Sequence, residues 1–61
     1  MTQAAILRLA YLASKHRMTE AEICRVLRES RAAQGKGEIA VATVDRSVRI
    51  AVAARMCKAA A

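Results

Sequence analysis

Several residue types that shape folds are missing or rare in this 61-residue chain. Proline, tryptophan and phenylalanine are absent, tyrosine occurs only as Tyr11, and glycine occurs only as Gly35 and Gly37. Alanine, arginine and leucine, which favour helices, are abundant. Because proline is absent, the two glycines are the only strong helix breakers. We therefore expect an all-α fold, with a core built from alanine, valine, isoleucine, leucine and methionine.

The residues that metal sites and enzymes require are also scarce. Cys24 and Cys57 form no C-x-x-C pair, and His16 is the only histidine, so a zinc-ligand set is lacking. The chain has no paired-carboxylate motif and no Walker-type glycine-rich loop, and no nucleophile is placed to work with His16. We expect a protein that is not an enzyme and uses no metal or cofactor. The apolar helical context of both cysteines predicts buried, reduced thiols.

Acidic residues are few compared with basic ones. Five Asp and Glu stand against eleven Lys and Arg, which gives a formal net charge of +6. So large a charge on so small a body favours a polyanionic partner, and nucleic acid is the first candidate. The alternative is that the charge serves only to keep the protein soluble.

Long apolar runs are missing as well, although 56% of the residues are hydrophobic. Arg8, Lys15 and Arg17 interrupt the N-terminal apolar segment, which therefore does not have the form of a signal peptide. No segment approaches the roughly twenty apolar residues of a membrane span. The sequence predicts a cytoplasmic protein that does not associate with membranes.

Hydrophobic periodicity predicts a three-helix bundle in one small domain over residues 1–61. The expected helices cover about residues 2–16, 19–33 and 42–60, with a glycine-marked loop at 34–40. Thr19 and Glu22 have the spacing of a capping box, in which each side chain accepts a hydrogen bond from the other residue's backbone N–H. Met18 and Ile23 have the spacing of a hydrophobic staple over the same turn.

The last predicted helix has two different faces. Val44, Val48, Ala51 and Val52 fall on one side at about 100° per residue, whereas Arg46 and Arg49 fall on the opposite side. The segment IAVATV, at residues 39–44, has the β-branched content of a strand, and we expect a short extended approach to the helix there. A two-strand ribbon between protomers is the alternative.

The two predicted helices from Thr19 onward resemble the helix-turn-helix of winged-helix transcription regulators, including the ferric uptake regulator family. In that family a T-x-x-E-I-x-x-x-L helix is followed by a basic A-T-V-x-R helix. The matching residues here are Thr19, Glu22, Ile23, Leu27, Ala42, Thr43, Val44 and Arg46. The resemblance covers a little over half of the chain. The break between the helices is longer than in compact members, and the residues after Met56 are too few for a β-hairpin wing.

This resemblance and the charge together predict a small transcription regulator that binds double-stranded DNA. Arg46 and Arg49 are the expected base contacts in the major groove, because the guanidinium fork can donate to O6 and N7 of guanine together. The expected phosphate contacts are Lys15, Arg17, Arg25 and Lys36. Lys15 and Arg17 precede a helix N-terminus, which also favours an anion, although a solvated charge run is the alternative.

The first predicted helix is apolar almost all round, which predicts a homodimer. The expected interface residues are Leu9, Leu12, Ile50, Ala54 and Cys57. Tyr11 is expected as a core or interface aromatic. An alternative function is a small protein-interaction module or inhibitor that binds a larger protein through its apolar helix faces. A membrane-active peptide is a third, but the capping box and the absence of Trp and Phe argue against it.

Overall fold

A computed structural model describes the backbone of residues 1–60 and the side chains of residues 1–55. It contains three helices, α1 (Gln3–Lys15), α2 (Glu20–Gln34) and α3 (Val41–Ala60), and the described residues include no strand. The predicted all-α fold is confirmed, and each helix end lies within one residue of the predicted position. Of the β-branched segment at residues 39–44, only Ile39 and Ala40 precede the helix, and the backbone is helical from Val41.

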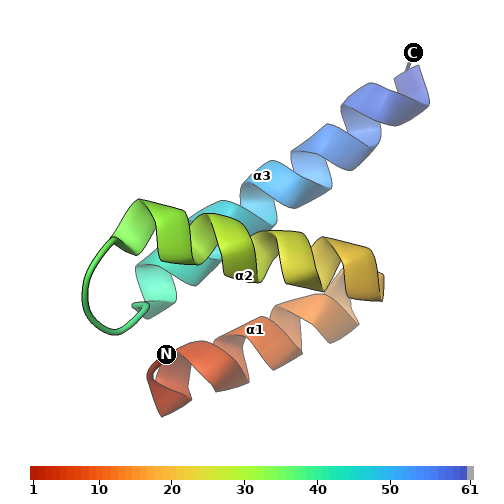
Figure 1. Cartoon of the computed structure of the whole chain (residues 1–61). Coiled ribbons are helices and arrows are strands. Elements are labelled where there is room, and N and C mark those ends of the chain that lie inside the picture. Colours follow the sequence, from red (N-terminus) through yellow and green to blue (C-terminus); the bar gives the residue numbers. More distant parts are fainter. Residues whose placement is uncertain (61) are drawn as a thin grey trace.

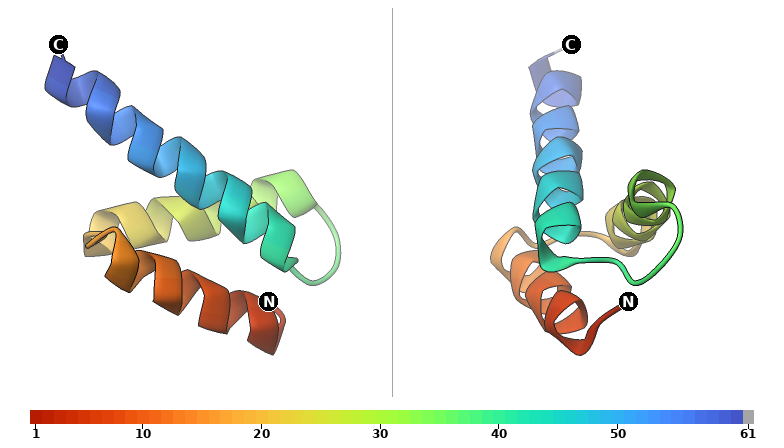
Figure 2. Two further views of the ribbon diagram at one scale, coloured as in Figure 1. Left: turned by 180° about the vertical axis from the view of Figure 1, so that it is seen from behind. Right: turned by 90° about the vertical axis from the view of Figure 1, so that its left-hand side faces the viewer.

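Helix α3 is the element against which the other two helices pack. Figures 1 and 2 show α1 and α2 joined by a tight turn; α3 crosses α2, behind it in the view of Figure 1 and in front of it in the left view of Figure 2. Contacts between helices are made by α3 with α2 and with α1, whereas α1 and α2 hardly touch one another. The C-terminal end of α3 projects past the other two helices (Figure 1). The core therefore lies along the earlier part of α3.

Side chains fix the start of each helix. At α1, the Thr2 hydroxyl accepts a hydrogen bond from the Ala5 N–H at 3.1 Å. At α2, the predicted capping box is present: Glu22 N–H donates to Thr19 Oγ1 at 3.2 Å, and Thr19 N–H donates to Glu22 Oε1 at 2.9 Å. At α3, Gln34 Oε1 accepts from the Thr43 hydroxyl at 2.8 Å and from the Ala40 N–H at 3.4 Å. The last residue of α2 thus helps to position the first turn of α3.

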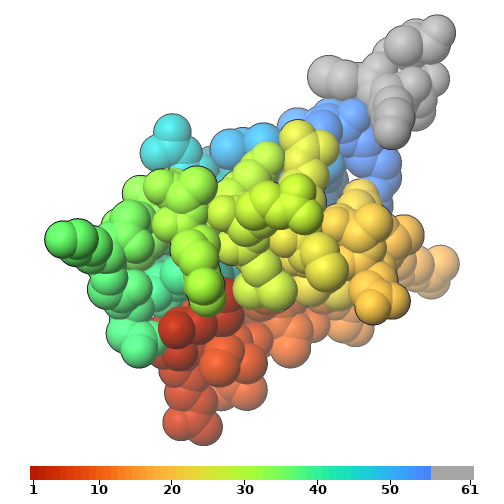
Figure 3. Space-filling model, viewed as in Figure 1, coloured from red at the N-terminus to blue at the C-terminus, as the bar shows by residue number. Residues whose placement is uncertain are grey.

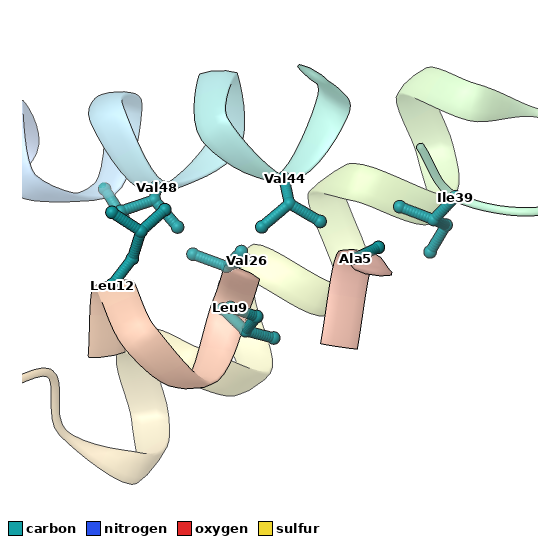
Figure 4. Close-up of a cluster of buried hydrophobic side chains, with 8 residues drawn as sticks. Ala5, Leu9, Leu12, Val26, Ile39, Val44 and Val48 are labelled. Atoms are coloured by element: carbon teal, nitrogen blue, oxygen red, sulfur yellow. The ribbon is translucent and has the colours of Figure 1, made fainter. Parts of the chain in front are cut away.

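The core is a small aliphatic cluster to which all three helices contribute. Figure 4 shows side chains of α1 meeting Val26 of α2 and the valines of α3, with Ile39 from the loop at one end. The buried hydrophobic residues are Ala5, Leu9, Leu12, Val26, Ile39, Val44, Val48 and Ala51. Between α2 and α3, Ser30 and Ser47 are also buried, and the Ser30 hydroxyl donates to Ser47 Oγ at 3.0 Å. These small side chains permit close approach of the two helices.

Leu9 and Leu12, expected at a dimer interface, lie instead in the core of the single chain. Helical spacing places them on one face of α1 with Ala5, and that face packs against α3. The outer side of α1 remains apolar, with Ile6 52% and Leu7 63% exposed. Of the apolar residues of α1 that were expected to need a covering partner, these outer residues are the ones that the single chain leaves exposed.

The expectation of a buried thiol at Cys24 is wrong, because this side chain is exposed. Cys24 precedes the buried Val26 by two positions, which is about 200° around a helix, so it points away from α3. Apolar neighbours in the sequence did not indicate burial here, since only a narrow face of α2 meets α3. The side chain of Cys57 lies outside the described residues.

Candidate nucleic-acid interface

Arg46 and Arg49 lie on the side of α3 that faces away from the core. Both side chains are exposed, whereas Val44 and Val48 on the opposite side are buried. The spacing of three residues brings both guanidinium groups to neighbouring positions on one helix surface. Among the described side chains, neither arginine forms an ion pair. The early part of α3 therefore presents two unneutralised cations to solvent.

Most of the acidic side chains are occupied by ion pairs within the chain. The pairs are Asp45 with Arg8 at 2.7 Å, Glu29 with Arg25 at 3.0 Å, Glu22 with Arg55 at 2.6 Å, and Glu38 with the N-terminal ammonium at 2.6 Å. Glu20 is the one acidic residue that forms none within the described part of the chain. Seven described basic residues are consequently unpaired: Lys15, Arg17, Arg28, Arg31, Lys36, Arg46 and Arg49. The positive charge of the sequence is thus presented at the surface.

The pair of Arg8 with Asp45 joins α1 to α3 beside the exposed arginines. Arg8 Nε donates to Asp45 Oδ1, and this hydrogen bond raises the pKa of Arg8. Asp45 directly precedes Arg46, so an unpaired carboxylate there would repel a phosphate close to the predicted contact. The neighbouring helix supplies the cation that offsets this charge.

A groove between α1 and α3 brings Arg49 together with residues of α1. Its volume is about 290 Å³, its apolar surface comes from Leu12, Val48 and Val52, and its polar residues are Arg8, His16, Asp45 and Arg49. An anion in this groove would meet Arg49 and the His16 side chain together. No local sequence pattern predicts that Arg49 and His16 line the same groove, because they are far apart in the sequence. The packing of α1 on α3 brings them together.

Tyr11 is on the surface and not in the core, with 55% of its area exposed. The Arg8 guanidinium lies 5.6 Å from the centroid of its ring, and the Lys15 ammonium lies 5.9 Å from it. These are distances at which a cation is attracted to an aromatic face. The ring therefore holds two basic side chains along one surface of α1.

Arg17 occupies an unusual backbone conformation at the end of α1. Its φ of 49° lies in the left-handed region, where glycine is favoured. Met18 N–H donates to the Ala13 carbonyl at 2.9 Å, and Arg17 N–H donates to the Ser14 carbonyl at 3.3 Å. This is the hydrogen-bond pattern of a Schellman motif with arginine at the usual glycine position. The Arg17 backbone thus has a defined conformation in the turn between α1 and α2, and its side chain is exposed.

The remaining predicted contacts are separated by the fold. Lys36 is exposed in the loop between Gly35 and Gly37, both of which have positive φ, just before α3. Arg25, in contrast, lines a groove between α2 and α3, on the other side of α3 from the groove that contains Arg49. Arg25 is also paired with Glu29. The structure therefore does not bring Arg25 to the surface that carries the predicted base contacts.

Two of the expected interface residues on α3 remain accessible. Ile50 is 46% exposed and Ala54 is half-buried beside α2. Ile50 follows Arg49 directly, so an apolar side chain adjoins the basic surface. A second copy could cover Ile50 without displacing the core residues.

Neither a metal cluster nor a membrane-spanning helix is found in the described part of the chain. No three or more His, Cys, Asp or Glu side chains there are grouped to hold an ion. No helix over the same residues is both long enough and apolar enough to cross a bilayer. Comparison with protein-family models, with known proteins and with solved structures finds no match. The resemblance to winged-helix regulators accordingly stays a prediction.

Proposed function

We propose that this protein binds double-stranded DNA through the outer surface of α3 and acts as a small transcription regulator. The observation that carries the proposal is the exposed, unpaired Arg46 and Arg49 on a helix whose opposite face is fixed in the core. A helix held in this way can enter the major groove as a rigid element. The use of acidic residues in internal ion pairs supports the proposal, because it leaves the outward-facing cations available for phosphates.

In this proposal, different residues contact the bases and the phosphates. Arg46 and Arg49 contact base edges, for which the arginine fork is suited to guanine. Lys15 at the end of α1, Arg17 in the turn after it and Lys36 in the loop before α3 supply charge to the phosphates. His16 joins them through the groove that it shares with Arg49. Arg25 is left out because it lies on the other side of α3.

A homodimer remains part of the proposal, with α3 and not α1 at its interface. Leu9 and Leu12 are excluded by their burial, which leaves Ile50 and Ala54 as the accessible apolar pair. Ile50 lies one turn after Arg46 on the same exposed face of α3. A two-fold contact at Ile50 would therefore cover part of the surface proposed for DNA, so dimer formation and DNA binding should compete.

The first test is binding of the protein to random-sequence duplex DNA at several salt concentrations. Affinity should fall steeply with salt, with a logarithmic slope equivalent to several phosphates. Selection from the same random pool should then yield a preferred site. Absence of binding at low salt would overturn the proposal.

The second test compares two double variants that remove the same charge. The Arg46→Ala, Arg49→Ala protein should lose about 1–3 kcal/mol of binding free energy per arginine on the preferred site and lose base preference there. The matched control is Arg28→Ala, Arg31→Ala, which removes two unpaired arginines from α2. This control should retain the base preference. Equal effects of both variants would show that charge alone drives binding.

A further inference from the structure

A second surface, separate from the α3 arginines, is formed by a groove between α1 and α2. We name it the α1–α2 groove; it is lined by Met1, Ile6, Leu27, Arg28, Arg31 and Ile39 and has a volume of about 410 Å³. Ile39 is buried and Met1 half-buried, whereas Ile6 is 52% and Leu27 37% exposed. In Figure 3 the red atoms of the start of the chain meet the yellow-green atoms of α2 on the face that carries this groove.

The groove is open because α1 and α2 share α3 as a support but scarcely contact each other. Packing on α3 holds Ala5 of α1 and Val26 of α2 in the core. No other described helix covers the sides of α1 and α2 that face away from α3 (Figure 2). Ile6 and Leu27, which line the groove, are exposed. Large apolar side chains that are exposed together in a groove mark interaction sites in soluble proteins.

The charge of the groove indicates what covers it. Arg28 and Arg31, one turn apart on α2, are exposed and form no ion pair with any described side chain. The nearby carboxylate of Glu38 is already bound to the N-terminal ammonium at 2.6 Å. The edge of the groove therefore has a net positive charge beside an apolar floor.

This charge argues against a second copy of the chain as the occupant. A two-fold dimer across the groove would bring Arg28 and Arg31 of both copies together, and like charges in such an interface oppose association. A partner that carries carboxylates beside its apolar residues would instead be attracted. A groove between two helices with an apolar floor is the kind of surface that binds an amphipathic helix in helix-in-groove complexes.

We propose that the α1–α2 groove binds an acidic amphipathic helix of a partner protein. The apolar face of that helix lies between Ile6 and Leu27, and its carboxylates pair with Arg28 and Arg31. The proposal is independent of DNA binding, because it uses none of the α3 arginines. If both proposals hold, the protein can carry a partner protein on one surface while the other contacts DNA.

The probe for this surface is a fluorescent amphipathic peptide of roughly 18 residues, with leucines at i, i+3, i+4 and i+7 and glutamates along both edges. Its binding to the full chain is followed by fluorescence anisotropy. A second peptide with lysine in place of every glutamate has the same apolar face. We expect saturable binding of the acidic peptide and at least about tenfold weaker binding of the basic one.

Matched variants locate the binding site. Ile6→Ser should weaken peptide binding by at least about tenfold, whereas Leu7→Ser, which removes a neighbouring and more exposed side chain outside the groove, should change it by less than about twofold. Likewise, Arg28→Ser with Arg31→Ser should weaken binding, and Arg46→Ser with Arg49→Ser should not. Circular dichroism confirms that each variant is folded, which we expect because all of these side chains are exposed.

Four outcomes would overturn the proposal. The first is equal binding of the acidic and basic peptides, and the second is equal effects of Ile6→Ser and Leu7→Ser. The third is a dimer in sedimentation that Ile6→Ser converts to monomer, because a second copy would then occupy the groove. Loss of DNA binding in Ile6→Ser would also count against it, since the two surfaces would not be separate.

Discussion

Arg55 of α3 binds the Glu22 carboxylate of α2 through two of its guanidinium nitrogens. Arg55 Nε donates to Glu22 Oε2 at 2.9 Å and Nη2 donates to Oε1 at 2.6 Å, while Nη1 donates to the carbonyl of His16 at 3.0 Å. Glu22 also accepts from the Thr19 N–H of its capping box. The Arg55 hydrogen bond, followed by that from Thr19, lowers the pKa of Glu22 from about 4.5 to about 2. One arginine thus joins α3 to the end of α1 and the start of α2.

Stability should therefore fall in acid through Glu22. Because the pKa in the folded state is lowered, the stabilising contribution is complete above the unfolded value near 4.5 and is lost as the pH falls toward about 2. Glu22→Gln should lower the melting temperature at neutral pH and flatten its dependence on pH within that window. Glu20→Gln is the control, since Glu20 lies in the same first turn without an ion pair. Identical pH profiles for the two variants would contradict the assignment.

Replacing Arg17 by glycine should stabilise the protein. The left-handed backbone at this position costs an L residue about 1–2 kcal/mol of folding free energy. Glycine avoids this cost, but its greater conformational freedom in the unfolded chain offsets part of the gain. We expect a gain of about 0.5–1 kcal/mol in urea unfolding. Arg17→Ala removes the same charge but keeps the strain, so it should give no such gain. If Arg17 contacts phosphate, both variants should weaken DNA binding equally.

The buried hydrogen bond of Ser30 with Ser47 should be detected as an energetic coupling. Either single change to alanine leaves one buried hydroxyl without its partner, at a cost of about 1–3 kcal/mol. The double variant should cost less than the sum of the single variants, with a coupling of about 1 kcal/mol in a double-mutant cycle. Ser14→Ala, at an exposed position, serves as a neutral control. Additive single effects would show that the hydrogen bond contributes nothing.

Substitutions of two hydrophobic residues, Ile50 and Leu12, distinguish an effect on dimerisation from an effect on folding. Ile50→Lys should shift the sedimentation mass from dimer toward monomer with little change in monomer stability, because Ile50 is 46% exposed. Leu12→Ala should instead lower stability by about 2–5 kcal/mol, since it opens a cavity in the core. A parent protein that is monomeric at micromolar concentration would remove the dimer from the proposal.

Local features of the fold followed from the sequence because their causes are local. The Thr19 and Glu22 spacing determines a capping box wherever a helix starts there, and the two glycines end the helical pattern before α3. The face of α3 that carries Arg46 and Arg49 was also predictable, since a helix places residues three apart on one side whatever its surroundings. The exposed arginines of the candidate site could therefore be named in advance.

Tertiary packing decided which of several apolar faces became the core. Helix α1 offers Leu7 and Leu9 with equal hydrophobicity, and only contact with α3 buries Leu9 and leaves Leu7 exposed. For the same reason Cys24 is exposed, and the α1–α2 groove has no signature in the sequence. The pairs of Arg8 with Asp45 and of Arg55 with Glu22 join residues more than thirty positions apart. Periodicity determines the faces of each helix, but the selection among them depends on which helices meet.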